Sequence, residues 1–186
     1  YLENLGLVGG WRGYLQGPGA KLYGLPYGAE TSILAYRADI FSRFDFKPPN
    51  TYFELEYLLG TVREKTGLGA LCTRSLAGHQ CVHAWLLHLN PMGGKVFDVS
   101  WRPRFNDASG VRALEFLRRV VETGPPGGGD FGQAEMMKSF LEGGSAMYLD
   151  STVILGAVRD SQRSKVDGKV AYTRHPKASK HASQSG

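Results

Sequence analysis

Short runs of apolar residues, separated by glycine, proline and polar residues, recur along the chain. Runs of about four to eight residues between turn signals are typical of β-strands. They lie at residues 22–27, 33–36, 70–72, 146–149 and 169–172. A turn followed by one more short strand is expected at residues 93–98. The pattern therefore predicts several short strands distributed over the whole chain.

Between these runs, apolar residues follow the 3.6-residue period of amphipathic helices. The best-signalled helix begins after the Pro-Pro-Asn break at residues 48–50, where Thr51 and Glu54 have the spacing of a capping box. Further helices are predicted at residues 79–89, 111–121, 136–141 and 153–159. Strands that alternate with helices predict an α/β architecture built in layers.

Length and composition are those of an ordinary globular protein. The chain has 186 residues, of which 42% are hydrophobic and 21% charged, which fits one domain or two small ones. A membrane-spanning helix needs about 20 predominantly apolar residues, and no stretch of the sequence satisfies this. No signal peptide is visible at the start of the sequence.

Charge is unevenly distributed along the chain. The formal net charge is +5, but residues 1–160 hold 16 basic and 16 acidic residues. Residues 161–186 hold six basic residues and one acid. Because the main part of the chain is neutral, it lacks the basic stripe that follows a phosphate backbone. Nucleic-acid binding is therefore not expected.

Two cysteines, Cys72 and Cys81, are too few for a disulfide framework. Either they form one isolated bridge in an exported protein or they are two buried free thiols. The redox state is left open by the sequence.

Several motifs have spacings that bear on catalytic or metal chemistry. His79 and His83 share a helix face at i, i+4, as zinc ligands do, but Cys81 between them points elsewhere. The glycine-rich segments 17–21 and 127–129 do not complete a phosphate-binding loop. No activated serine or cysteine motif is present. No metal ion, cofactor or catalytic residue is therefore expected.

Asp150 is the most informative polar residue. It follows the apolar run 146–149, just before Ser151 or Thr152 begins a predicted helix. Ligands of open α/β sheets bind at the carboxyl ends of strands, where a carboxylate can accept hydrogen bonds from neighbouring hydroxyls of a sugar or polyol. The alternative is that Asp150 only caps the helix.

Tyr27 and Glu30 occupy a comparable position after an earlier strand. There an aromatic ring and a hydrogen-bond acceptor could meet a carbohydrate.

Taken in order, these segments resemble the extracellular solute-binding proteins (family 1) of carbohydrate ABC importers. The resemblance rests on Tyr-Gly-Leu-Pro-Tyr at residues 23–27, Tyr-Arg-Ala-Asp-Ile-Phe at 36–41, Pro-Pro-Asn-Thr-Tyr-Phe-Glu-Leu at 48–55 and the Gly-Gly turn at 93–98. The polyol-binding branch, for sorbitol and mannitol, is the most similar. Its motifs match residues 101–105, 124–127, 131–135 and 147–153.

The resemblance implies a type II periplasmic-binding-protein fold, in which two α/β lobes enclose a ligand cleft. It also implies that the 186 residues are an internal portion of a longer protein. Residues 1–35 would belong to the first lobe and 36–170 would form the second lobe, an open sheet flanked by helices. Residues 171–186 would cross back toward the first lobe.

The implied function is capture of a sugar or polyol and its delivery to the membrane subunits of an ABC permease. The matching positions nominate Tyr27, Glu30, Arg74, Asp150 and Thr152 as ligand-binding residues. A monomer in the periplasm or outside the cell, with or without a lipid anchor, is implied as well. The alternatives are a fragment of a carbohydrate-active hydrolase that uses two carboxylates, and a non-catalytic interaction module.

Overall fold

The computed structural model describes residues 23–24 and 28–178 of the chain. From Thr31 onward the chain forms one compact unit, and residues up to Glu30 belong to another. The strand predicted at residues 22–27 includes Tyr27, which lies outside the described residues. In the first unit, Tyr23 and residues 28–30 are exposed and have no regular secondary structure.

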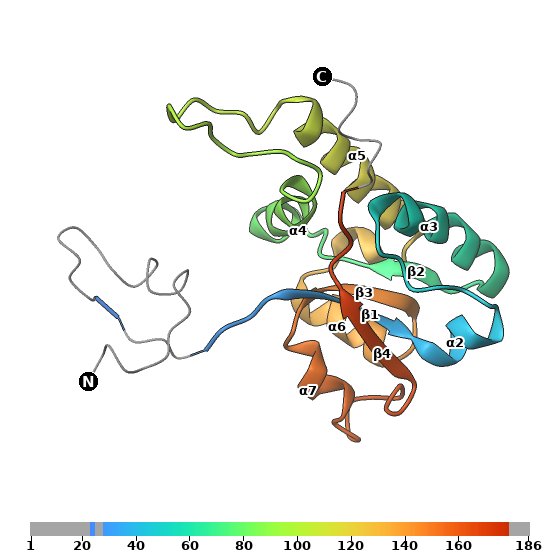
Figure 1. Ribbon diagram of the computed structural model, residues 1–186. Helices are drawn as coiled ribbons and strands as arrows, with labels where there is room; N and C mark the ends of the chain where they lie inside the picture. Colours follow the sequence, from blue (N-terminus) through green and yellow to red (C-terminus); the bar gives the residue numbers. More distant parts are fainter. Residues whose placement is uncertain (1–22, 25–27, 179–186) are drawn as a thin grey trace. The chain divides into compact units, whose positions relative to one another are not determined.

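The second unit is built on a four-stranded sheet of mixed direction (Figure 1). Its strands are β1 (Ser32–Arg37), β2 (Gly69–Cys72), β3 (Ser145–Ser151) and β4 (Val170–Arg174), in the order β2-β3-β1-β4. Strands β2 and β3 are parallel, whereas β1 is antiparallel to both β3 and β4. The carboxyl ends of β2, β3 and β4 therefore lie at the same end of the sheet, together with the start of β1. This end, and not an outer strand, is called the sheet edge below.

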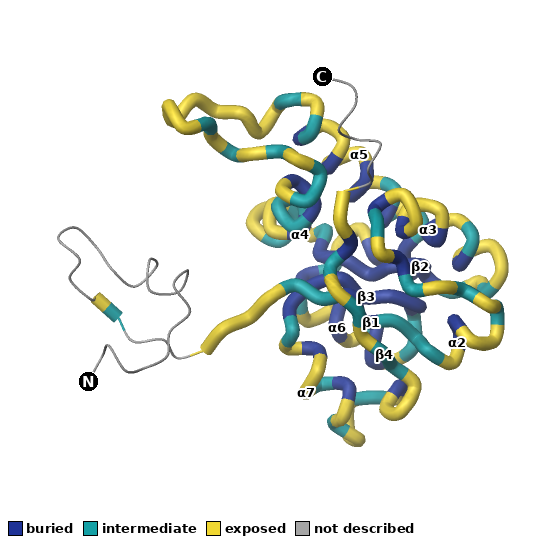
Figure 2. Tube along the Cα trace, viewed as in Figure 1, coloured by how far each residue is buried: buried dark blue, intermediate teal, exposed yellow. Residues whose placement is uncertain are grey.

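Helices cover both faces of this sheet, as the burial pattern in Figure 2 also shows. They are α2 (Ala38–Arg43), α3 (Tyr52–Thr66), α4 (His79–Leu89), α5 (Ala108–Thr123), α6 (Gln133–Leu141) and α7 (Ile154–Val158), with a 3₁₀ turn, η3, at Gly128–Asp130. Successive strand residues point to opposite faces. Accordingly Leu34 packs in the core cluster of α2, α3 and α5, and Ala35 in that of α6 and α7. The predicted α/β architecture is confirmed.

Helix α3 shows how local sequence sets an element. The Thr51 side chain accepts a hydrogen bond from the Glu54 N–H, and the Glu54 carboxylate accepts one from the Thr51 N–H. The helix ends at Gly67, whose φ of 70° is a left-handed conformation that glycine adopts without a Cβ penalty. The capping box is therefore confirmed.

Three features differ from the predictions. Residues 93–98 form no strand; Phe97 makes an isolated bridge with Pro103, and the Asp98 carboxylate accepts the N–H groups of Ser100 and Arg102 in the turn that follows. Helix α2 was not predicted. Strand β3 continues through Ser151, two residues beyond the predicted run, so Asp150 is its penultimate residue and lies at the carboxyl end of the strand as predicted. Among the described helices, none has the length and apolarity to cross a bilayer.

Candidate ligand-binding site

A buried ion pair joins the carboxyl ends of the two parallel strands. Arg74 Nε donates to Asp150 Oδ2 at 2.8 Å, and Arg74 Nη2 donates to Asp150 Oδ1 at 2.6 Å. Asp150 is only 1% exposed and Arg74 8%. This two-pronged geometry is the strong form of a charge-assisted hydrogen bond. It fixes the position of both charges at the edge of the sheet.

The fold brings the two residues together from distant parts of the sequence. Cys72, the last residue of β2, pairs with Tyr148 of β3, so the chain leaving β2 runs beside the end of β3. Every residue of both strands is buried. Arg74 therefore reaches Asp150 from the adjacent strand, across 76 positions of sequence.

The proposal that Asp150 caps the following helix is wrong in its simplest form. Its Oδ1 atom accepts a hydrogen bond from the Ser151 N–H at 2.7 Å, and its other bonds go to Arg74. The hydroxyl of Ser151 instead accepts the Val153 N–H at 3.2 Å, just before α7. Asp150 thus belongs to the sheet edge, and Ser151 serves the turn into the helix.

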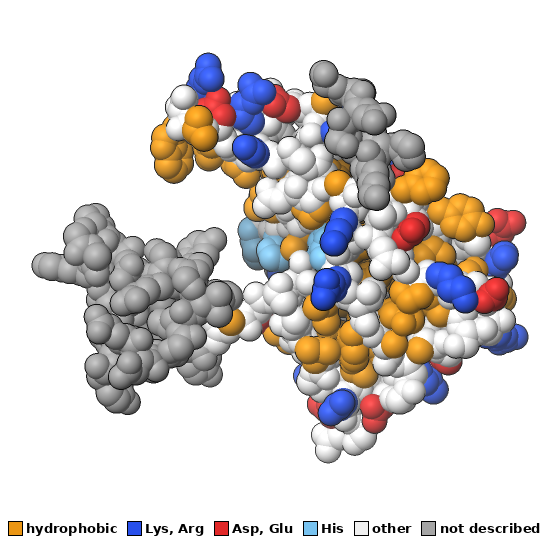
Figure 3. Space-filling model, in the orientation of Figure 1, with side chains coloured by type: hydrophobic (Ala, Val, Ile, Leu, Met, Phe, Trp, Pro, Cys, Tyr) orange, Lys and Arg blue, Asp and Glu red, His pale blue; other side chains and the backbone are white. Residues whose placement is uncertain are grey.

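Helix α4 adds two polar side chains that the sequence did not nominate for ligand binding. Gln80 Oε1 accepts from Arg74 Nη1 at 3.3 Å, and His83 Nε2 lies 3.8 Å from Asp150 Oδ2. The His83 side chain is 45% exposed, and Figure 3 shows histidine side chains at the surface in this part of the second unit. The i, i+3 spacing of Gln80 and His83 on one helix face is the only sequence signal for these two residues. No group of three or more metal-ligating side chains occurs among the described residues.

The other nominated residues stand in different situations. The Thr152 hydroxyl accepts a hydrogen bond from the Thr31 N–H at 3.4 Å, and the Thr152 N–H donates to the Thr31 carbonyl at 2.9 Å. Thr152 therefore extends the pairing of β1 with β3 at the same edge. Glu30 is exposed and belongs to the first unit, and Tyr27 is outside the described residues. The structure brings together Arg74, Asp150 and the segment that contains Thr152.

A second polar cluster occupies the β1–β4 side of this edge. The Tyr52 hydroxyl lies 2.8 Å from His88 Nδ1 and 2.9 Å from His175 Nε2, and His175 Nδ1 lies 2.9 Å from Ser32 Oγ. Burial lowers the pKa of His88 to about 3, and the neighbouring His175 adds to this shift. Burial likewise lowers the pKa of His175 and raises that of the Tyr52 phenol. All three groups are therefore neutral near pH 7, and the phenol donates to one imidazole and accepts from the other.

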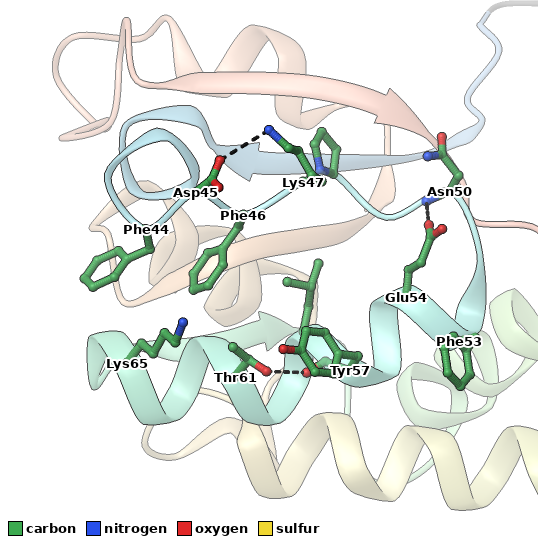
Figure 4. A pocket seen from close by; sticks show the side chains of 12 residues that line it. Phe44, Asp45, Phe46, Lys47, Asn50, Phe53, Glu54, Tyr57, Thr61 and Lys65 are labelled. Atoms are coloured by element: carbon green, nitrogen blue, oxygen red, sulfur yellow. Dashed lines mark hydrogen bonds and ion pairs between the residues drawn. The ribbon is translucent and has the colours of Figure 1, made fainter.

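Two cavities lie near these elements. One, of about 500 Å³, is lined by residues of α4 (Leu86, Leu87) and by Ser32 and His175 at the sheet edge. The other, of about 590 Å³, lies between α3 and the segment after α2, where the rings of Phe44 and Phe46 face Lys65 (Figure 4).

Both volumes suit a small ligand. In the second cavity, however, Glu54 serves the α3 cap and Asp45 pairs with Lys47 at the surface. The first cavity shares its edge and its helix with the buried ion pair. The ion pair and the α4 side chains that contact it are therefore the candidate site, at the carboxyl ends of β2 and β3; the first cavity lies farther along α4, beside the start of β1 and the end of β4.

The family model described as "Bacterial extracellular solute-binding protein" matches residues 3–185. The chain is 32% identical over 161 residues to a "Mannitol-binding protein" of Pseudomonas aeruginosa. The match covers 84% of this chain and 37% of that protein.

Solved structures show the same fold. A solute-binding protein of Agrobacterium vitis with bound D-mannitol has a TM-score of 0.79 and 28% identity, and covers 89% of this chain and 41% of that one. A solute-binding protein of Agrobacterium radiobacter in complex with ribitol has a TM-score of 0.82 at 24% identity, covering 89% and 42%. The fold is thus that of type II periplasmic binding proteins, and the chain spans about two fifths of the length of these relatives.

Proposed function

The chain belongs to the family of bacterial extracellular solute-binding proteins, and on that premise we propose that the intact protein captures a sugar or polyol for an ABC importer. The names of two relatives support a polyol: one is a mannitol-binding protein, and another was solved with D-mannitol bound. The ligand would be held in a cleft between two lobes and delivered to the membrane permease.

The observation that carries this proposal is the buried Arg74–Asp150 pair at the sheet edge. Removing two charges from water costs several kcal/mol per ion, and well-packed apolar residues often serve stability as well or better. Stability alone therefore does not account for an ion pair in this place. Charged groups that converge at the carboxyl ends of strands are suited to binding the hydroxyls of a polyol.

The lobe assignment completes the proposal. The sequence predicts the second lobe at residues 36–170, with residues 1–35 in the first lobe and 171–186 returning to it. Because β1 (Ser32–Arg37) and β4 (Val170–Arg174) are whole strands of the second unit's sheet, we assign both strands to the second lobe and the residues up to Glu30 to the first. Tyr27 and Glu30 would contribute to the ligand site from the first lobe, and Arg74, Asp150 and Thr152 from the second. Ligand contacts to both lobes would bias a hinge motion toward the closed form, which then docks on the permease.

We place the intact protein in the periplasm or outside the cell, free or lipid-anchored, and as a monomer. The family description and the names of the relatives support this location. The proposed function is binding, as the family description states.

Isothermal titration of the intact protein with D-mannitol, ribitol and maltose tests the proposal. We expect saturable binding of at least one of the three. We expect the Asp150→Ala variant to bind at least tenfold more weakly, since Arg74 and the α4 side chains beside it lose the charge-assisted hydrogen bonds that hold them in place, and a hydrogen bond to a charged group contributes about 1.5–3 kcal/mol. Absence of binding by the wild type, or conversion of maltose to glucose, would overturn the proposal.

A further inference from the structure

The ion pair leaves little of the Asp150 carboxylate for a ligand. A carboxylate has about four acceptor positions. Three are occupied by Arg74 Nε, Arg74 Nη2 and the Ser151 N–H, at 2.8, 2.6 and 2.7 Å. At 1% exposure, Asp150 also presents almost no surface to solvent. The remaining acceptor position is on Oδ2, the atom that His83 Nε2 approaches to 3.8 Å.

His83 both touches the ion pair and reaches solvent. It lies in the second turn of α4, with Nε2 3.8 Å from Asp150 Oδ2 and a side chain that is 45% exposed. Gln80, one turn earlier, contacts the other partner through Arg74 Nη1. The negative charge of the Asp150 carboxylate favours the tautomer of His83 that carries its proton on Nε2, and so it influences how the imidazole ring is oriented.

The chemistry of the ring suits a polyol. With the Nε2–H turned toward Asp150, the imidazole meets a polyol hydroxyl through its acceptor nitrogen, Nδ1. The buried carboxylate 3.8 Å from Nε2 attracts the ring electrostatically, and a ring biased toward one orientation loses less freedom when the ligand binds.

We propose that His83 contacts the bound polyol directly, and that Arg74 and Asp150 are positioning residues that hold His83 and Gln80. This inference rests on the proposed function and adds a binding residue that the sequence did not nominate. In this arrangement Arg74 and Asp150 do not contact the ligand; they hold the side chains that do.

The test compares His83→Ala with Val82→Ala in the intact protein, by isothermal titration with D-mannitol or with whichever tested polyol the wild type binds. Val82 is the residue before His83 in α4 and is 52% exposed. Its side chain lines an apolar groove between α4 and α5, together with Leu114, and is not part of the candidate site. We expect His83→Ala to weaken binding at least tenfold and Val82→Ala to leave it within threefold. His83→Gln, which keeps a donor and an acceptor, is expected to retain more affinity than His83→Ala.

A second readout does not depend on a variant. The imidazole nitrogen resonances of His83 are expected to shift when D-mannitol saturates the ¹⁵N-labelled wild type. Binding by the wild type with an unchanged affinity in His83→Ala, or with no shift of these resonances, would overturn the inference while leaving the proposed function intact. A wild type that binds no sugar or polyol would instead refute the function itself.

Discussion

Replacing Asp150 by alanine is expected to destabilise the second unit strongly. The change leaves the Arg74 guanidinium buried, with 10% of its side chain exposed and without its carboxylate partner. Breaking a buried ion pair by removing one partner costs about 3–5 kcal/mol, because the remaining charge stays desolvated. We expect a loss of this size in the free energy of unfolding.

A matched exposed pair separates burial from distance. Arg118 Nη1 lies 2.6 Å from Glu122 Oε1 on α5, the same separation as between Arg74 Nη2 and Asp150 Oδ1. Its side chains are 66% and 52% exposed, so Glu122→Ala should cost no more than about 0.5 kcal/mol.

Urea denaturation of the intact protein, followed by tryptophan fluorescence, measures both variants. A double variant, Arg74→Leu with Asp150→Leu, should recover much of the stability lost in Asp150→Ala, since no charge is then left buried. It should not recover polyol binding. Equally small losses of unfolding free energy in Asp150→Ala and Glu122→Ala would refute the argument that burial makes the loss of one partner of the Arg74–Asp150 pair costly.

Three further results are expected. Tyr52→Phe removes the hydroxyl between His88 and His175 and should lower the free energy of unfolding by about 1–3 kcal/mol in urea denaturation, because a buried imidazole nitrogen loses its partner; an unchanged midpoint would contradict this. The pKa of His88 is lowered to about 3 in the folded protein, so the unfolded state binds more protons below the ordinary value of about 6.5. The contribution of neutral His88 to the free energy of unfolding is therefore fully present above pH 6.5 and is lost as the pH falls toward 3. In urea denaturation at several pH values, the free energy of unfolding should fall less steeply with decreasing pH in His88→Gln than in the wild type; identical slopes would refute this. Burial raises the pKa of the Cys72 thiol to about 12, so a thiol reagent at pH 8 should label the partly exposed Cys81 first; equal labelling rates would argue against it.

The elements that could be predicted are those set by residues close in the sequence. The capping box of Thr51 and Glu54 and the apolar face that follows it define α3 within one turn of its start. The short strand 33–36 is flanked by turn signals and is recovered as β1. At residues 93–98 the segment ends in a turn: the Asp98 carboxylate accepts hydrogen bonds from the N–H groups of Ser100 and Arg102, the residues that follow it.

The site was only half predictable, for a physical reason. Asp150 could be found because a carboxylate at the end of an apolar run is unusual, and Arg74 only through family resemblance. Their pairing depends on the parallel alignment of β2 with β3, which no local signal records. The spacing of His83 with His79 is that of a metal ligand, yet in the structure His83 Nε2 lies 3.8 Å from the carboxylate of Asp150, on a strand distant in sequence.

The most direct test of the account is a crystal structure of the intact protein with D-mannitol bound. We expect the polyol at the carboxyl ends of β2 and β3, beside α4, with a hydroxyl within hydrogen-bond distance of His83 and with the Arg74–Asp150 bonds intact behind it. A polyol bound instead in the cavity between α3 and Phe46, or one that contacts neither α4 nor the sheet edge, would contradict it.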